Sequence, residues 1–132
     1  MADLTYDLVA HIREQRAFSE RTFGPGSRAQ GVIDHIRKEL IEIEQNPGDL
    51  MEWIDVVLLA LDGAWRAGNS PEVVAAALAG KLKQNKTRTW PDWRTAEPGK
   101  AIEHVRDEDP LNPELGPEHR EYWIRKAEAQ NG

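Results

Sequence analysis

The stretch EWIDVVLLALDGAWR, residues 52–66, decides the expected fold. Apolar residues occupy nearly every side of a helix built from it, and such a helix is normally buried. Three carboxylates interrupt this pattern: at about 100° per residue, Glu52, Asp55 and Asp62 fall on one narrow face together with Arg66. A lone buried carboxylate is so costly that it pairs, takes up a proton or binds a metal. The stretch therefore predicts the central helix of an all-α bundle that also carries a functional site.

A second helix is predicted directly before it, over about residues 28–45. Its apolar stripe consists of Val32, Ile33, Ile36, Leu40 and Ile43. The sequence Asn46-Pro47-Gly48 ends this helix, because proline cannot continue the helical ladder and glycine suits a chain reversal. Asp49 is expected to cap the next helix. So short a turn predicts an antiparallel hairpin of the two helices.

The hairpin brings acids of both helices toward one another. Glu39 and Glu42 are three residues apart and share a face, which would lie opposite Glu52 and Asp55. Four converging carboxylates repel one another unless a cation is present, and Mg²⁺ prefers carboxylates, waters and substrate phosphates. The alternative is that Glu52 only caps its helix and that Glu39 and Glu42 are solvated. His35 shares their face and is expected to be a hydrogen-bonded helix residue rather than a ligand.

The remaining sequence predicts two more helices and an irregular tail. Leu4, Leu8, Val9 and Ile12 have helical spacing, which predicts a helix over residues 3–16, and TFGPGS, residues 22–27, predicts a loop. Ser70-Pro71 begins a helix expected over 71–88. Its expected apolar side is Val73, Val74, Ala77, Leu78 and Leu82.

A single domain, 1–132, is expected. Its helical catalytic core covers about 18–94, and an extended segment over about 95–132 carries a short helix near 117–130.

Composition excludes several classes of protein. Lys and Arg number 17 against 23 Asp and Glu, for a formal net charge of -6. Nucleic-acid binders usually carry a basic excess, so DNA or RNA is not the expected partner. The absence of cysteine excludes disulfides and thiolate metal sites. No apolar run suits a signal peptide or a membrane span, so a cytoplasmic protein without a membrane partner is expected.

The residues of both predicted hairpin helices resemble those of a known family. The pattern Glu39-x-x-Glu42, a turn, then Glu52-x-x-Asp55 is similar to the metal signature of the MazG-like all-α nucleoside triphosphate pyrophosphohydrolases. Longer strings resemble their dATP/dGTP diphosphohydrolase subgroup, found in phages and bacteria. These strings are Thr22-Phe23-Gly24-Pro25-Gly26, Asp34-His35-Ile36-Arg37-Lys38-Glu39-Leu40, Glu52-Trp53-Ile54-Asp55, Leu61-Asp62-Gly63-Ala64-Trp65-Arg66 and Trp90-Pro91-Asp92-Trp93-Arg94. The resemblance covers about residues 18–106.

The resemblance implies an enzyme that converts a purine deoxynucleoside triphosphate, dGTP or dATP, and water into the monophosphate and pyrophosphate. It implies a bundle that assembles into dimers or tetramers, with Glu39, Glu42, Glu52 and Asp55 as ligands of Mg²⁺, for which Mn²⁺ can substitute. Lys38 stands where the signature often has a further acid, and the gap from Glu42 to Glu52 is short. A missing acid implies that fewer metal ions are held, or that another residue such as Asp62 takes over the role of ligand.

Chemistry assigns further roles to single residues. A carboxylate beside the attacking water would orient it and accept its proton, and Glu39 is the candidate because it lies nearest the interhelical seam. Lys81, Asn85 and Arg88 form a polar stripe that could bind phosphates, sugar or base, or simply face solvent. Trp90 could stack on a purine or fill a core.

The Gly/Pro loop offers one more candidate contact with the substrate. Phe23 could be a lid over the base or an anchor of the loop.

The sequence leaves two other functions open: a pyrimidine-specific relative such as a dUTPase, and a non-catalytic helical interaction protein. The 52–66 helix is apolar on more sides than one neighbouring helix can cover. We therefore expect an obligate oligomer, a dimer or tetramer, with Trp53, Val57 or Ala60 near the contact.

Overall fold

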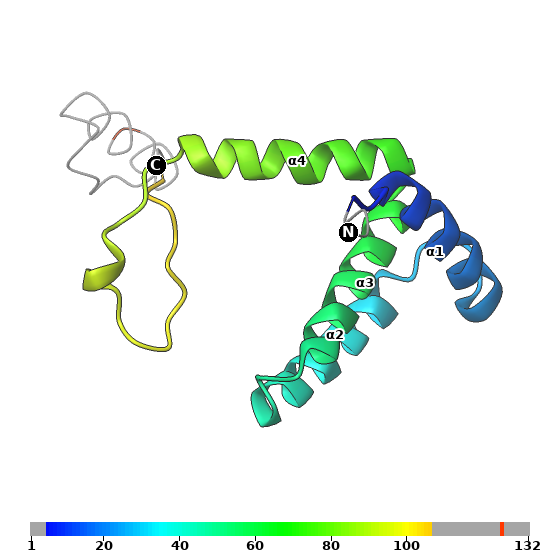
Figure 1. The fold of residues 1–132 in the computed structure, drawn as a ribbon, viewed down its shortest axis with the longest axis horizontal. Helices are drawn as coiled ribbons and strands as arrows, with labels where there is room; N and C mark the ends of the chain where they lie inside the picture. Colours follow the sequence, from blue (N-terminus) through cyan, green and yellow to red (C-terminus); the bar gives the residue numbers. More distant parts are fainter. Residues whose placement is uncertain (1–4, 107–124, 126–132) are drawn as a thin grey trace. The chain divides into compact units, whose positions relative to one another are not determined.

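The computed structural model describes residues 5–106 and residue 125, and within these the regular structure is entirely helical (Figure 1). This confirms the predicted all-α class. Contacts divide the chain into two compact units, Met1–Lys81 and Leu82–Gly132, and each unit is described by itself.

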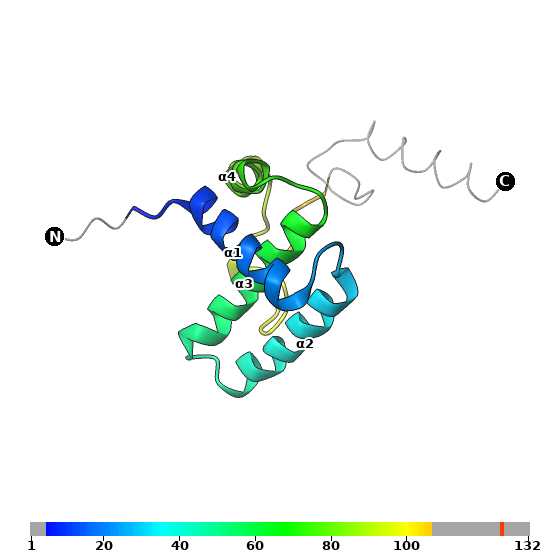
Figure 2. The ribbon, with the colours of Figure 1, turned by 90° about the vertical axis from the view of Figure 1, so that its right-hand side faces the viewer.

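The first unit is organised around α3 (Leu50–Arg66). α3 packs along most of its length on α2 (Ala29–Gln45) and over a shorter stretch on α1 (Leu8–Phe23). Figures 1 and 2 show α2 and α3 side by side as the predicted antiparallel hairpin. The turn is also as predicted, because the Asp49 carboxylate accepts a hydrogen bond of 3.0 Å from the backbone N–H of Met51.

α1 begins and ends later than predicted. Its start at Leu8 rather than residue 3 follows from Asp7, whose carboxylate caps the helix by accepting from the backbone N–H of Ala10. Its end is fixed by Gly24, whose φ of 89° lies in the left-handed region that favours glycine. Thr22 and Phe23 therefore form the last turn of α1, and the prediction of a loop at these two residues is wrong.

The buried apolar core of this unit is small. Ile12, Trp65 and Val74 form one cluster, and Leu8, Leu61 and Ala64 pack against it. Val32 and Ile43 of α2 are also buried apolar side chains. Val74 belongs to α4 (Pro71–Thr87), whose bounds agree with the predicted 71–88. The predicted apolar side of α4 is not a buried face, because Val73, Leu78 and Leu82 are exposed.

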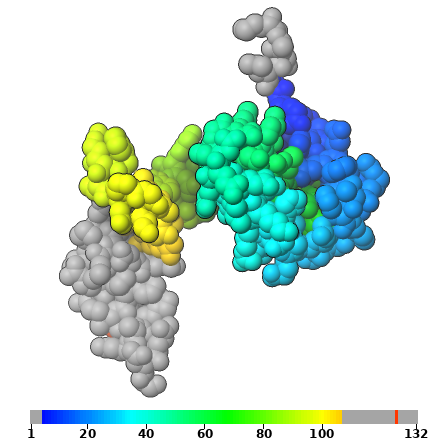
Figure 3. Space-filling view, turned by 90° about the horizontal axis from the view of Figure 1, so that it is seen from below, coloured from blue at the N-terminus to red at the C-terminus, as the bar shows by residue number. Residues whose placement is uncertain are grey.

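α3 is less buried within one chain than its composition predicts. Trp53 is 50% exposed and Val57 is 51% exposed, and Ile54 is also open to solvent. The expected burial of this helix is therefore wrong for the single chain. Figure 3 shows part of the surface of α2 in cyan. Leu40 and Ile41 of this helix are exposed as well. No helix in the described part of the chain has the length and apolarity needed to cross a bilayer.

A buried polar network around Arg66 joins α1, the following loop and α3. The Arg66 Nε donates to Asp62 at 3.1 Å, and Nη1 donates to the carbonyl oxygens of Gly24 and Gly26 at 2.9 and 2.8 Å. Nη2 donates to the hydroxyl of Ser19 at 2.9 Å, and that hydroxyl donates to Asp62 at 2.6 Å. Arg66, Asp62 and Ser19 are each at most 8% exposed. The Arg66 guanidinium therefore fastens the loop to the end of α3, and each of its three nitrogen atoms donates a hydrogen bond.

The described part of the second unit contains the last residues of α4, from Leu82 to Thr87, and then a loop closed on itself. The backbone N–H of Val105 donates to the carbonyl oxygen of Thr89 at 2.8 Å, and the rings of Trp90 and His104 meet edge to face at 5.7 Å. A short 3₁₀ helix, Trp93–Thr95, lies inside this loop. The helix predicted near 117–130 lies outside the described residues, except for Arg125, which is helical.

We predict that the Arg66 network contributes a large part of the stability of this unit. Arg66→Ala removes one partner of a buried ion pair and leaves Asp62 uncompensated, which costs about 3–5 kcal/mol of unfolding free energy. Arg37→Ala on the exposed face of α2 is the matched control, expected within about 0.5 kcal/mol of the wild type. Urea unfolding followed by circular dichroism measures both. Equal unfolding midpoints for the two variants would contradict a structural role for the network.

Candidate functional site

Three of the four predicted metal-binding carboxylates converge between α2 and α3. Glu39, Glu52 and Asp55 each offer one oxygen atom, and these atoms all lie within 4.8 Å of one another. We call these residues the acidic trio. They meet because the 46–49 turn reverses the chain, so that Glu39, in the second half of α2, lies opposite the first turns of α3.

Glu39 is the least exposed member of the trio. It is 8% exposed, and its Oε2 atom is buried without a hydrogen-bond partner among the described residues. Its other oxygen lies 3.4 Å from Nε2 of His35, one helical turn earlier. A buried carboxylate oxygen without a partner is costly. The Oε2 of Glu39 is therefore the atom of this site that would gain most from a bound cation.

Glu42 stands beside the trio rather than within it. Its carboxylate lies next to that of Glu52, and this neighbour is the main reason why the pKa of Glu52 rises from 4.5 to about 7. Partial desolvation and the nearby carboxylate of Glu39 raise it further. Near neutral pH, a proton on Glu52 relieves part of the repulsion that a divalent cation would otherwise relieve.

Asp62 is on the same face of α3 but has a different role. Its Oδ1 accepts from Ser19 and its Oδ2 accepts from Arg66, so both oxygens are engaged within the buried network. It is therefore poorly placed to substitute for a missing metal ligand, although sequence alone suggested it as a substitute.

A cavity of about 330 Å³ joins the acids to an apolar surface. The acidic part of its lining includes Glu39, Asp55 and Asp62, and the residues Phe18, Phe23, Leu58 and Leu59 provide the apolar part. The rings of Phe18 and Phe23 meet edge to face at 6.3 Å. Phe23, a predicted substrate contact, thus lines the same cavity as the acids.

Sequence reasoning missed three residues of this cavity, Gln15, Phe18 and Ser19 of α1. The predicted helix ended at residue 16, so the extra turns that carry Phe18 and Ser19 were not recognised as helical. The available signal was the spacing of Gln15, Phe18 and Ser19, which places them on one face of a longer helix.

The other predicted substrate contacts have their own local partners. The Asn85 side chain accepts from Arg88 at 3.0 Å, and the Asn85 backbone carbonyl accepts from the Trp90 indole at 2.7 Å. Trp90 is 43% exposed and packs on His104. Lys81 is the last residue of the first unit, whereas Asn85, Arg88 and Trp90 belong to the second.

We predict that the raised pKa of Glu52 makes metal-free stability depend on pH. Between pH 4.5 and about 7 the folded chain holds a proton that the unfolded chain has lost, so this contribution falls as pH rises. Glu52→Gln mimics the protonated form. In EDTA it should match the wild type near pH 4.5 and melt at a higher temperature above pH 7. A difference in melting temperature between Glu52→Gln and the wild type that stays constant with pH would contradict this. Glu44→Gln, exposed elsewhere on α2, is the control and should show no such pH-dependent difference.

Comparison with known proteins identifies the family of the chain. A family model described as dATP/dGTP pyrophosphohydrolase matches residues 11–109, which include the acidic trio, Phe23 and the closed loop of the second unit. The chain is also 35% identical over 118 residues to the Eaa protein of Salmonella phage P22. That alignment covers 89% of this chain and 36% of the phage protein, so the chain spans about a third of this relative's length. No solved structure matches the chain.

The match favours neither a pyrimidine-specific nor a non-catalytic protein, and it confirms the family that the motifs suggested. The chain belongs to the dATP/dGTP pyrophosphohydrolases, a MazG-like family of hydrolases.

Proposed function

We propose that the chain hydrolyses purine deoxynucleoside triphosphates, dGTP and dATP, to the monophosphate and pyrophosphate with Mg²⁺ as cofactor. The observation that carries this proposal is the buried, unpartnered Oε2 of Glu39 within the acidic trio. Hard oxygen donors in this number fit Mg²⁺, which Mn²⁺ can replace. The family match supports the reaction class.

The chain's own residues divide the work of the reaction. The cation would be held by Glu39, Glu52 and Asp55, with Glu42 beside them. When bound, it would neutralise phosphate charge and lower the pKa of the attacking water. Glu39 is the proposed general base: it orients the water that attacks the α-phosphorus and accepts its proton. The bond from the α-phosphorus to the bridging oxygen breaks, and pyrophosphate leaves with that oxygen.

The substrate contacts are proposals of the same kind. Phe23 is proposed to cover the base, because it lines the cavity that contains the acids. Lys81 and Arg88 are proposed to hold phosphate oxygens and Asn85 a sugar or base group. Trp90, anchored by its indole N–H, is proposed to offer a stacking surface.

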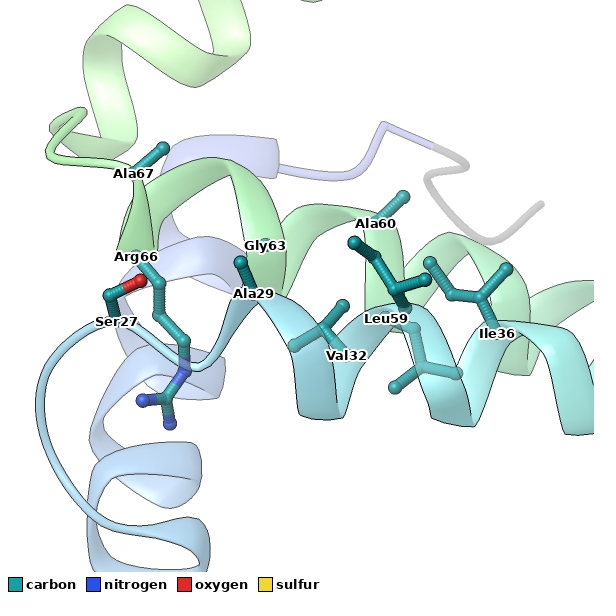
Figure 4. A pocket seen from close by; sticks show the side chains of 10 residues that line it. Ser27, Ala29, Val32, Ile36, Leu59, Ala60, Gly63, Arg66 and Ala67 are labelled. Atoms are coloured by element: carbon teal, nitrogen blue, oxygen red, sulfur yellow. The ribbon is translucent and has the colours of Figure 1, made fainter.

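We further propose that the enzyme is a homo-oligomer, a dimer or tetramer. Trp53, Val57 and Ala60 form an exposed apolar stripe on α3. The stripe continues into an apolar hollow of about 260 Å³ between α2 and α3, which Figure 4 shows with Ile36, Leu59 and Ala60 on its walls. Burial of apolar surface is worth roughly 25 cal/mol per Å², so pairing this face with a second copy would stabilise both chains.

Substitutions of the carboxylates test the metal site. Glu39→Gln, Glu42→Gln, Glu52→Gln and Asp55→Asn are each expected to lower kcat for dGTP by about 100-fold or more, the scale of losing a group that stabilises transition-state charge. Glu44→Gln, exposed on α2, should keep wild-type activity. EDTA should abolish turnover and excess Mg²⁺ or Mn²⁺ should restore it. Near-normal activity in two of the four variants, with helicity intact, or full activity in EDTA would refute the proposal.

Light scattering on a sizing column tests the assembly. We expect a mass at least twice that of the 14.9 kDa chain at micromolar concentration. Val57→Lys places a charge on the stripe and should shift the protein toward the monomer. Val73→Lys makes the same change at an equally exposed site on α4 and should not, since both valines are 51% exposed. A wild-type monomer that hydrolyses dGTP would rule out an obligate oligomer.

A further inference from the structure

Hydrogen bonds fix the orientation of one polar side chain that lines the acidic cavity beside Phe18, that of Gln15 on α1. Its Nε2 donates to the backbone carbonyl oxygen of Leu58 at 2.7 Å. Its Oε1 lies 2.9 Å from Nε2 of His11. Because a carbonyl oxygen only accepts, Leu58 fixes which end of the Gln15 amide carries the nitrogen.

The same reasoning fixes the histidine. The Gln15 oxygen only accepts, so His11 Nε2 carries the proton, and the Tyr6 hydroxyl donates to His11 Nδ1 at 2.6 Å. Three side chains thus form a directed chain of hydrogen bonds that ends at Leu58. One N–H of the Gln15 amide remains after these bonds, and no described residue accepts from it. The cavity therefore contains a preorganised donor.

The neighbours of Gln15 suit a flat aromatic ring. Phe18 is 53% exposed and Phe23 is 48% exposed, and both line the cavity together with Gln15 and Leu58. The carboxylates of the same cavity would hold the metal and the triphosphate. The exposed aromatic pair beside them is therefore suited to bind the base of the same nucleotide.

The family name gives two bases, adenine and guanine, and one hydrogen-bond donor in the cavity could serve both. Adenine and guanine present opposite hydrogen-bonding groups at position 6, so a donor directed there would separate them. Both rings offer acceptor nitrogens at N3 and N7. A donor that accepts both purines must therefore address one of these two atoms.

We propose that Gln15 is a specificity-determining residue that donates its remaining amide N–H to N3 or N7 of the purine, with Phe18 and Phe23 packing on the ring. This inference rests on the proposed function and adds to it the recognition of the base. α1 then contributes the base subsite, and α2 and α3 contribute the metal-binding carboxylates.

Substrates that lack one ring nitrogen test this directly. The wild type would be assayed with dATP, 7-deaza-dATP and 3-deaza-dATP, in which a C–H replaces one acceptor. We expect kcat/KM to fall about tenfold for one of the two analogues, the scale of leaving a buried donor without its acceptor. Gln15→Leu should lower kcat/KM for dATP by a similar factor and should no longer distinguish that analogue from dATP.

The controls separate recognition from folding and from the reaction itself. Gln30→Leu makes the same chemical change at an exposed position of α2 and should discriminate like the wild type. Phe18→Leu should lower kcat/KM for all three substrates by one common factor. If the wild type hydrolyses both analogues as fast as dATP, or if a folded Gln15→Leu keeps the discrimination, the assignment of Gln15 is wrong while the proposed function stands. A wild type without activity on any purine substrate would overturn both.

Discussion

The Arg66 guanidinium is the constraint on which the rest of the first unit depends. It binds Asp62 and Ser19 and the carbonyl oxygens of Gly24 and Gly26, and it is almost completely buried. Figure 4 shows the side chain extending from the end of α3 toward this loop. A buried cation is tolerated only with such a set of partners. Because the apolar core is small, this network acts together with the packing of Ile12 on Trp65 to fix α1 against α3, and among the described residues it alone fastens the carbonyl oxygens of Gly24 and Gly26 in the loop. It thereby sets the wall of the cavity to which α1 contributes.

Electrostatic repulsion among carboxylates governs the other wall. Glu39, Glu52 and Asp55 are held at ligand distance by a hairpin that forms for reasons unrelated to charge, namely the 46–49 turn and the packing of α2 on α3. Glu52 also lies beside Glu42, and the hydrogen bond between these two carboxyl groups, followed by desolvation and the nearby Glu39, raises the pKa of Glu52 to about 7. A proton on Glu52 and a bound cation would thus be alternative ways to relieve the same repulsion. The hairpin holds the carboxylates together, and a cation would make their arrangement favourable.

Local chemistry allowed much of this arrangement to be predicted. The turn before Asp49, the helix pairing and the convergence of Glu39 with Glu52 all follow from residue type and helical spacing. The end of α1 could not be predicted from apolar spacing, because one left-handed glycine decides it. The Gln15 bond to Leu58 joins residues 43 positions apart and depends on tertiary packing. The exposure of the apolar α3 stripe likewise depends on tertiary packing, which leaves Trp53 and Val57 about half exposed within one chain.

Hydrolysis of dGTP in water enriched with ¹⁸O tests most directly whether the acidic trio directs water to the α-phosphorus. Mass spectrometry of the products after one turnover locates the oxygen that came from solvent. With Glu39 as the base for attack at the α-phosphorus, the label appears in the nucleoside monophosphate and the pyrophosphate stays unlabelled. Label in the pyrophosphate, or release of orthophosphate with a nucleoside diphosphate, would place the attack at another phosphorus and contradict the proposed chemistry.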